Sequence, residues 1–178
     1  MKALLIIDML KDFVKENAPL EVPESRNIIN PIKNLIEKAR KTKTMVIYIC
    51  DSHREDDPEF DIWPRHCVSG TEGSEVIDEL KPEKNDYIVR KRKYSGFFGT
   101  DLDSILREFK VEELIITGIV TNICVLYTSS DAVNLGYRIT VPRDCVAGLN
   151  EEDHEWALKQ IEEVLNGKIL DSSDIEWT

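Results

Sequence analysis

The sequence predicts an α/β fold in which a parallel sheet is covered by helices on both faces. Segments with strand patterns alternate with segments that have helical patterns along the chain. The strand segments are almost continuously apolar, which is typical of strands buried on both faces of a parallel sheet. Because the 178 residues contain no repeat, linker or low-complexity segment, we expect a single domain spanning residues 1–178.

The individual elements follow from apolar periodicity. Short apolar, β-branched runs predict strands, whereas apolar side chains three or four positions apart predict helices. In the first helix Ile28, Ile32 and Leu35 have this spacing, and Ser25 is expected to be the N-cap. A long polar segment, residues 51–73, contains prolines and glycines and is expected to be a loop. We predict strands at residues 3–7, 44–50, 87–89, 114–117 and 138–142, and helices at residues 25–41, 75–80, 101–109, 124–135 and 151–165.

The composition argues against several classes of protein. Apolar residues make up 42% and charged residues 32% of the chain, which is typical of a soluble globular protein. The formal net charge of −11 disfavours nucleic acid and anionic membranes as partners. No apolar run approaches the ~20 residues that span a bilayer, and the N-terminal run is too short for a secretion signal. Four cysteines without such a signal indicate reduced thiols and a cytoplasmic protein.

Polar side chains follow each predicted strand. Asp8 follows the first strand, Asp51 the second and Lys91 the third, while Cys124 lies just beyond the fourth and Asp144 follows the fifth. The carboxyl ends of parallel strands meet at one edge of the sheet, where ligands bind in folds of this class. We therefore expect a functional site at that edge.

Cys124 lies where a strand turns into a helix. The helix dipole and free backbone N–H groups at such a turn favour a thiolate and a nearby oxyanion. A thiolate that hydrolyses an amide also needs an acid for the leaving amine and a source of water. Asp8 could exchange the proton, and Lys91 could stabilise the thiolate. The alternatives are a buried inert thiol, a turn-capping Asp8 and an ordinary surface Lys91.

A second group of residues has the character of a metal site. Asp51 and His53 are two apart in an extended segment, so they share a face, and His66 is a third candidate ligand. One carboxylate and two imidazoles suit a divalent transition metal and leave positions open for water or substrate. The rival is a closed structural zinc site formed by Cys50, His53, His66 and Cys67, which the same face argument disfavours.

Four segments carry a resemblance that covers nearly the whole chain: residues 8–13, 63–73, 91–100 and 118–125. They are similar to the isochorismatase-like cysteine hydrolases, which include nicotinamidases and N-carbamoylsarcosine amidases. The resemblance implies a three-layer αβα Rossmann-like sandwich. It also implies that Asp8, Lys91 and Cys124 are the catalytic residues.

The same resemblance implies further features of the site. It implies a cis peptide between Ile119 and Val120, and an oxyanion hole formed by the amides of Val120 and Cys124. Residues 63–73 are similar to the nicotinamidase segment around the last metal histidine; in nicotinamidases a metal coordinates the pyridine nitrogen and aromatic residues enclose the ring. Phe13 and Trp63 match these aromatic positions, although core packing would also explain Phe13. We expect zinc, with iron or manganese as alternatives, bound by Asp51, His53 and His66, in a homodimer or homotetramer.

Two departures weaken the match to nicotinamidases. Leu10 stands where those enzymes usually have glutamine, and the segment after Lys91 is shorter, as in the carbamoyl-amide hydrolases. Several cations near these segments could bind a substrate carboxylate or be ordinary solvated charges, and Lys93 is a fallback for the catalytic lysine. These cations are Arg65, Arg90, Arg92 and Lys93.

The sequence therefore predicts a metal-containing cysteine amidohydrolase that acts on a small primary amide through a thioester, nearest to nicotinamidase. The alternative enzyme is an N-carbamoylsarcosine amidase or a related carbamoyl-amide hydrolase with the same triad. A third hypothesis, of a different class, is a catalytically silent binding protein on this fold. The remaining histidine, His154, is expected to lie on the surface of the last helix.

Overall fold

The computed structural model describes residues 1–177 and contains a seven-stranded sheet in which every pairing is parallel. The path across the sheet is β3-β2-β1-β4-β5-β7, and β6 pairs with β4 off this path. This arrangement confirms the predicted fold class. The strands are β1 (Lys2–Ile7), β2 (Met45–Asp51), β3 (Tyr87–Lys91), β4 (Glu113–Ile119), β5 (Arg138–Pro142), β6 (Val146–Ala147) and β7 (Lys168–Leu170).

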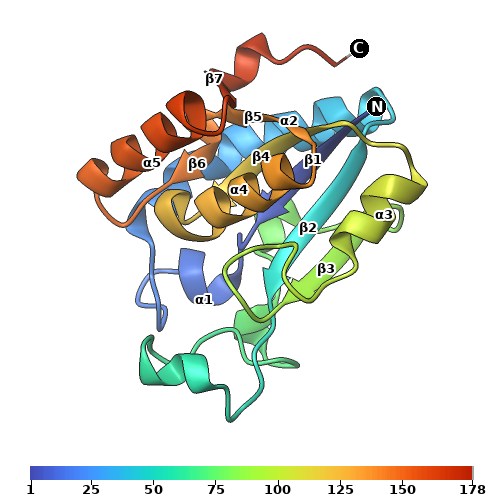
Figure 1. The fold of residues 1–178 in the computed structure, drawn as a ribbon. Helices are drawn as coiled ribbons and strands as arrows, with labels where there is room; N and C mark the ends of the chain where they lie inside the picture. The colour runs from blue at the N-terminus through green and yellow to red at the C-terminus, as the bar shows by residue number, and fades with distance from the viewer. Residues whose placement is uncertain (178) are drawn as a thin grey trace.

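Helices cover both faces of the sheet (Figure 1). The side chains of α1 and α2 pack into one core, and those of α3, α4 and α5 pack into the other, which makes three layers. The helices are α1 (Lys11–Val14), α2 (Ile29–Lys41), α3 (Leu102–Glu108), α4 (Leu126–Asn134) and α5 (Glu151–Glu163). None of the helices within residues 1–177 is long and apolar enough to cross a membrane.

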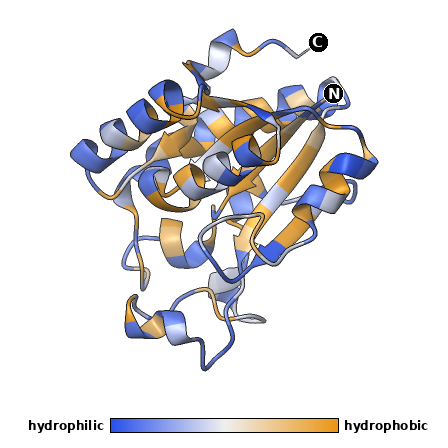
Figure 2. Ribbon diagram, in the orientation of Figure 1, coloured by the Kyte–Doolittle hydropathy of each residue, from blue (hydrophilic) through white to orange (hydrophobic). Residues whose placement is uncertain are grey.

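The strands are apolar on both faces because each face is buried. In β1, Leu4 and Ile6 belong to the core beneath α2, whereas Ala3, Leu5 and Ile7 belong to the opposite core. Successive side chains of a strand point to opposite faces, so a strand that serves two cores has no polar alternation. Figure 2 shows this as a hydrophobic sheet between helices whose outer faces are hydrophilic.

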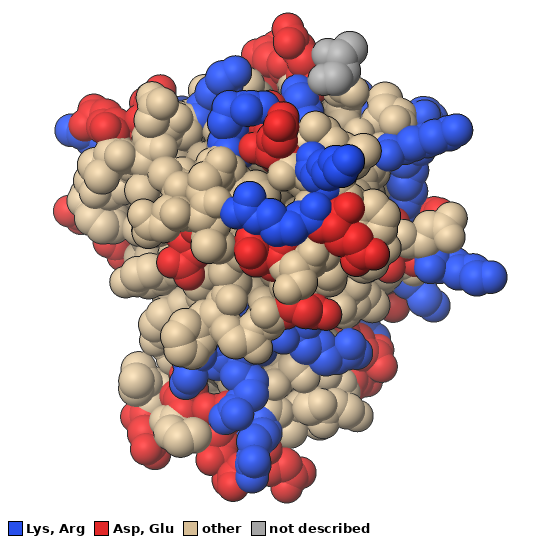
Figure 3. Space-filling view, turned by 45° about the vertical axis from the view of Figure 1, so that its right-hand side comes forward, with Lys and Arg blue, Asp and Glu red and all other residues tan. Residues whose placement is uncertain are grey.

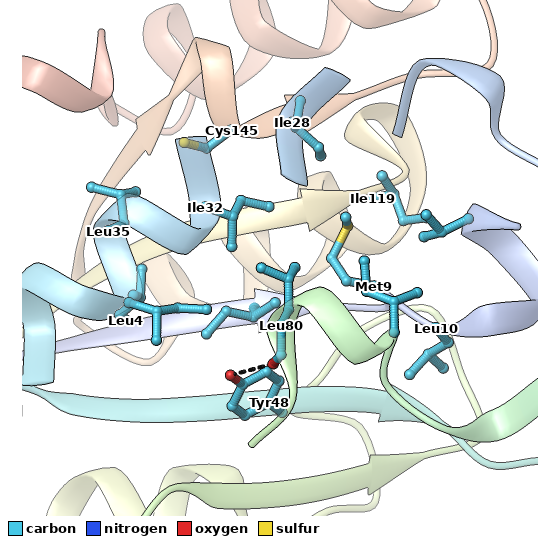
Figure 4. Close-up of a cluster of buried hydrophobic side chains, with 14 of the residues drawn as sticks. Leu4, Met9, Leu10, Ile28, Ile32, Leu35, Tyr48, Leu80, Ile119 and Cys145 are labelled. Atoms are coloured by element: carbon cyan, nitrogen blue, oxygen red, sulfur yellow. Dashed lines mark hydrogen bonds between the residues drawn. The ribbon is translucent and has the colours of Figure 1, made fainter. Parts of the chain in front are cut away.

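The core beneath α2 joins the sheet to the segment after the long loop. Ile32 and Leu35 of α2 pack in one cluster with Leu4, as Figure 4 shows. In the same cluster, the Tyr48 hydroxyl donates a hydrogen bond of 2.7 Å to the carbonyl of Leu80. A buried phenol needs such a partner, and this bond ties the chain near Leu80 to β2.

The prediction of a helix at residues 75–80 is wrong. Residues 75–77 are extended and follow a 3₁₀ turn, η3 (Glu72–Ser74), and only residues 78–80 form a 3₁₀ turn, η4 (Asp78–Leu80). Leu10 and Val76 form an antiparallel bridge, and the Ile77 N–H donates to the Met9 carbonyl at 3.1 Å. These backbone groups bond to another segment, so they cannot also form the i to i−4 bonds of a helix.

Two other boundaries also differ from prediction. The first helix is preceded by a 3₁₀ segment, η1 (Pro23–Ile28), and the Ser25 hydroxyl lies inside it without capping α2. Residues 121–125 form a π-helical turn, η5 (Thr121–Val125), before α4 begins at Leu126. The short elements α1, β6 and β7 were not predicted, because segments of two to four residues carry too little periodicity.

Charges of both signs are interspersed on the surface. On the face drawn in Figure 3, lysine and arginine side chains lie among aspartate and glutamate side chains rather than in a patch of one sign. The net charge of −11 therefore does not create a uniformly acidic surface on this face.

Gly118 allows β4 and β1 to approach closely just before the functional edge. It pairs in register with Ile7 and has a φ of +105°. A Cβ atom at this position would lie 2.0 Å from the Ile7 carbonyl oxygen. The close approach holds the ends of β1 and β4 side by side, where Asp8 and the turn with Cys124 begin.

We predict that Gly118→Ala destabilises the fold far more than Gly136→Ala does. Gly136 also has a positive φ, +91°, but a Cβ there meets nothing within 4 Å. The backbone strain common to both variants costs about 1–3 kcal/mol, and the clash with β1 adds at least about 4 kcal/mol for Gly118. Urea unfolding would measure the difference, and equal losses in the two variants would contradict it.

Candidate active site

Three neighbouring strands bring Asp8, Asp51 and Lys91 together at their carboxyl ends. Lys91 ends β3, Asp51 ends β2 and Asp8 follows β1, and these strands are adjacent in the sheet. The Lys91 Nζ lies 2.9 Å from Asp8 Oδ2 and also forms an ion pair with Asp51 Oδ1. The Asp51 N–H donates to Asp8 Oδ1 at 2.8 Å. The lysine is 1% exposed, so its charge is compensated almost wholly by these two carboxylates.

Cys124 approaches the same lysine from the end of β4. Cys124 belongs to the π-helical turn η5, and its Sγ lies 3.4 Å from Lys91 Nζ. The peptide between Ile119 and Val120 is cis, which confirms the expectation drawn from the resemblance. The structure thus brings together the acid, the cation and the thiol that the sequence places at the ends of three different strands.

Burial sets the protonation of these groups. Burial, with the nearby charge of Asp51, raises the pKa of Asp8 to about 6, although Lys91 opposes the rise. Burial also raises the pKa of the Cys124 thiol well above its usual value, more than the attraction of Lys91 lowers it. Burial therefore opposes the thiolate that the strand-to-helix turn favours, and Asp8 lies within hydrogen-bond reach of the thiol as a proton acceptor.

Asp51, His53 and His66 form a compact group of buried donor atoms. Their ligand atoms lie within 4.8 Å of one another. Asp51 Oδ2 lies 3.4 Å from His53 Nε2 and 3.5 Å from His66 Nε2. Asp51 therefore directs Oδ1 to Lys91 and Oδ2 to the two imidazoles.

The two imidazoles are held in the orientation that metal ligands require. The Nδ1 of His66 bonds to the Pro64 carbonyl at 2.6 Å, and the Nδ1 of His53 lies 3.2 Å from Asp57 Oδ2. Both Nε2 atoms therefore face Asp51, and the Nε2 of His53 is a buried nitrogen without a hydrogen-bond partner. An orphaned imidazole nitrogen beside a carboxylate and a second imidazole fits a divalent transition metal.

A small pocket opens onto both groups. Its walls are mainly apolar and aromatic, and they include Phe13, Trp63 and Tyr94. The indole N–H of Trp63 donates to the Tyr94 hydroxyl at 3.1 Å, which joins the loop before His66 to the loop after Lys91. The other lining residues are Asp8, Leu20, Val22, Asp51, Glu59, His66, Ile119, Val120, Ile123, Cys124 and Leu149.

Comparison with known proteins identifies the family. A family model described as the isochorismatase domain matches residues 2–174. The chain belongs to the isochorismatase family.

Solved structures of relatives in this family share the fold over nearly the whole chain. Nicotinamidase/pyrazinamidase PncA from Bacillus subtilis is 37% identical, with a TM-score of 0.91, over 96% of this chain and 99% of that chain. N-carbamoylsarcosine amidase from Thermoplasma acidophilum is 39% identical, with a TM-score of 0.90, over 98% of each chain. Pyrazinamidase of Pyrococcus horikoshii in complex with zinc is 34% identical, with a TM-score of 0.90, over 96% of this chain and 98% of that chain.

The four cations considered as partners for a substrate carboxylate do not line the pocket. Arg65 bonds to the Glu55 carbonyl at 3.0 Å, and Arg92 bonds to Asp57 at 2.9 Å. The Nζ of Lys93 lies 3.8 Å from Glu59, and the exposed Arg90 faces a separate polar cleft. Among residues 1–177, the pocket lining includes neither lysine nor arginine.

Several other predicted residues also lie away from the pocket. Asp144 accepts a hydrogen bond of 2.8 Å from the Ser172 N–H, and the Sγ of Cys67 faces the Gly73 carbonyl at 3.8 Å. The groups of close ligand atoms found in residues 1–177 include no cysteine, which disfavours the closed zinc site. His154 is not a simple surface residue, because its Nδ1 bonds to the buried Thr121 hydroxyl at 2.8 Å.

Sequence reasoning missed Glu59, Tyr94 and Leu149 as pocket residues in this member of the isochorismatase family. Glu59 Oε1 lies 3.9 Å from His53 Nε2. It therefore adds an oxygen donor near Asp51, His53 and His66, the three residues called the metal group below. The available signal was the run Asp57-Pro58-Glu59, in which an aspartate caps a 3₁₀ turn, η2 (Pro58–Asp61), and Pro58 begins it. That pattern predicts the turn, but it does not predict where the Glu59 side chain points.

We predict that Lys91→Met lowers the free energy of unfolding by about 3–5 kcal/mol, because it leaves Asp8 and Asp51 buried without a counter-ion. Lys93→Met is the matched control. Its side chain is 50% exposed, so we expect a change within about 0.5 kcal/mol. Urea unfolding of the metal-free proteins would measure both. Wild-type stability in Lys91→Met would show that the lysine does not hold the two carboxylates.

Proposed function

We propose that this protein is a cysteine amidohydrolase that releases ammonia from a small neutral aromatic amide, such as nicotinamide or pyrazinamide, through a thioester. The observation that carries the proposal is the position of Cys124. Its thiol contacts Lys91, lies near the buried base Asp8, and lines an apolar pocket with aromatic walls. A nucleophile, a proton acceptor and a fixed cation are what amide hydrolysis by a thiol requires.

The first half of the reaction forms a thioester. Asp8 takes the proton of the Cys124 thiol while the sulfur attacks the amide carbon. The carbonyl oxygen becomes an oxyanion, which the amides of Val120 and Cys124 stabilise. The C–N bond then breaks, and the proton held by Asp8 passes to the leaving nitrogen, which departs as ammonia. The ammonium of Lys91 stabilises the sulfur while it carries negative charge.

The second half returns the enzyme to its resting state. Asp8, again a carboxylate, removes a proton from a water molecule that attacks the thioester carbon. The C–S bond breaks, and Asp8 returns the proton to the sulfur. The balance is one amide and one water consumed, with one carboxylic acid and one ammonia formed. A pKa of about 6 suits Asp8 to this exchange, because it is mostly ionised near neutral pH yet able to hold a proton.

Asp51, His53 and His66 would hold a divalent metal, and Glu59 would offer a further oxygen. When bound there, the metal would supply a Lewis acid at the pocket wall, able to bind a ring nitrogen or to polarise water. Support comes from the orphaned His53 Nε2 and from the donor set itself. The zinc complex of the related pyrazinamidase agrees with this choice of metal.

The charges around the pocket favour a neutral substrate. Its ionisable lining groups are Asp8, Asp51, Glu59, His66, Tyr94 and Cys124, and no lysine or arginine of residues 1–177 is among them. An anionic substrate would meet three carboxylates and apolar walls without a lysine or arginine to pair with, which disfavours it in a low-dielectric pocket. The aromatic side chains of Phe13 and Trp63 in the lining suit a flat aromatic ring instead.

We predict that Cys124→Ala abolishes ammonia release from nicotinamide, with a loss on the order of 10³-fold or more, while the protein stays folded. Cys145→Ala is the matched control, because that thiol is buried in the core beneath α2 (Figure 4) and away from the pocket. It should keep wild-type turnover per folded molecule. Ammonia assays with circular dichroism would test both variants. Full activity in folded Cys124→Ala would end the proposal.

A substrate panel tests the choice of amide. We expect kcat/KM for nicotinamide or pyrazinamide to exceed that for N-carbamoylsarcosine by about 100-fold or more, because burying an unpaired carboxylate costs roughly 3 kcal/mol or more. The alternative substrate deserves inclusion because the related N-carbamoylsarcosine amidase is 39% identical. A preference for N-carbamoylsarcosine would contradict the choice of a neutral aromatic amide and favour the carbamoyl-amide alternative.

A further inference from the structure

Asp57 is a buried carboxylate that the proposed reaction does not use. Its side chain is 0% exposed and receives three hydrogen-bond donors. Oδ2 lies 3.2 Å from His53 Nδ1 and 2.9 Å from Arg92 Nε, and Oδ1 accepts from the Glu59 N–H at 3.2 Å. No substrate-facing role is open to it, because it does not line the pocket.

We propose that Asp57 is a positioning residue that fixes the tautomer of His53 for metal binding. A carboxylate only accepts hydrogen bonds, so the His53 nitrogen that faces it must carry the proton. The Nδ1 of His53 is hydrogen-bonded to Asp57, whereas its Nε2 has no hydrogen-bond partner although Asp51 Oδ2 lies 3.4 Å away. The proton on Nδ1 therefore leaves a lone pair on Nε2, which faces Asp51 and His66. This inference rests on the metal site described under the proposed function.

The three donors around Asp57 make an amide a poor substitute for the carboxylate. In Asp57→Asn, one of the two terminal atoms becomes an NH₂ donor. If that donor faces His53 and Arg92, it repels the guanidinium and favours the His53 tautomer with the proton on Nε2. That nitrogen would then have no lone pair for a metal. If the amide is turned over, the Glu59 N–H loses its acceptor at the start of η2 instead.

Arg92 completes the arrangement. Its guanidinium contacts the same oxygen as His53, so it compensates the buried charge of Asp57. The imidazole of His66 is oriented by a neutral group, the Pro64 carbonyl. The two histidines therefore differ, and only His53 depends on a charged residue outside the metal group. Carboxylates in this position typically raise ligand basicity and metal affinity.

The test is zinc affinity, measured on metal-free protein by competition with a chromophoric chelator. We expect Asp57→Asn to weaken zinc binding about 10- to 100-fold. Arg92→Ala should weaken it in the same direction but less. Asp56→Asn is the matched control, since Asp56 is exposed and pairs only with the neighbouring Arg54 among the described residues. It should bind zinc like the wild type.

A spectroscopic measurement tests the tautomer itself, and its wild-type arm does not depend on the folding of any variant. In alkaline buffer, ¹⁵N NMR of the metal-free wild type should place the His53 proton on Nδ1. In Asp57→Asn it should move towards Nε2. A proton on Nε2 of the wild type would overturn the inference, as would wild-type zinc affinity in folded Asp57→Asn.

Comparing zinc binding by Asp51→Asn and Asp57→Asn distinguishes a failure of this inference from a failure of the proposed metal site. If Asp51→Asn loses zinc but Asp57→Asn does not, the metal site stands and the role of Asp57 is refuted. If the wild type fails to bind zinc, or if Asp51→Asn binds it unchanged, the metal site and the inference fall together. Loss in both variants, with Asp56→Asn unaffected, supports the role of Asp57.

Discussion

The buried ammonium of Lys91, held between Asp8 and Asp51, is the interaction on which the rest of the site depends. Removing three charges from water is costly, and the cost is recovered only when the partners meet in close and fixed geometry. The strand order supplies that geometry, because β3, β2 and β1 end side by side. Gly118 adds the fourth strand end by letting β4 lie against β1. The buried ion cluster therefore depends on the sheet, which brings these strand ends together.

Asp51 links the two kinds of chemistry at this edge. One of its oxygens pairs with the lysine that also contacts the thiol, and the other faces both metal-group histidines. A metal at that oxygen and an ammonium at the other would both hold the carboxylate ionised. The pKa of Asp51 is held well below its usual range, because Lys91 and the histidines outweigh the effect of burial. Asp8, which has fewer such partners, is left with the raised pKa that a proton carrier needs.

The sheet and its polar edge could be predicted because both follow from short-range patterns. Continuous apolar strands alternate with helices, and a polar residue after each strand must lie at the common edge. The loop between Asp51 and Gly73 is different, since tertiary contacts decide its path. The Asp12 carboxylate accepts the Cys67 N–H at 2.8 Å, with Cys67 at a φ of +45°. No periodicity encodes such contacts, so Asp57 and Glu59 escaped prediction. The sequence also did not show how strongly burial opposes the thiolate that the helix position favours.

The basic run Arg90-Lys91-Arg92-Lys93 shows why charge alone is a poor guide to substrate. As a sequence it suggests a site for an anion. In the fold, Lys91 turns inward to Asp8 and Asp51, Arg92 pairs with Asp57, and Lys93 lies near Glu59. Three of the four cations thus serve as counter-ions for buried acidic residues, namely Asp8 and Asp51 for Lys91, Asp57 for Arg92 and Glu59 for Lys93. Because their charges are directed to these partners and none of the three lines the pocket, the basic run does not form an anion site there.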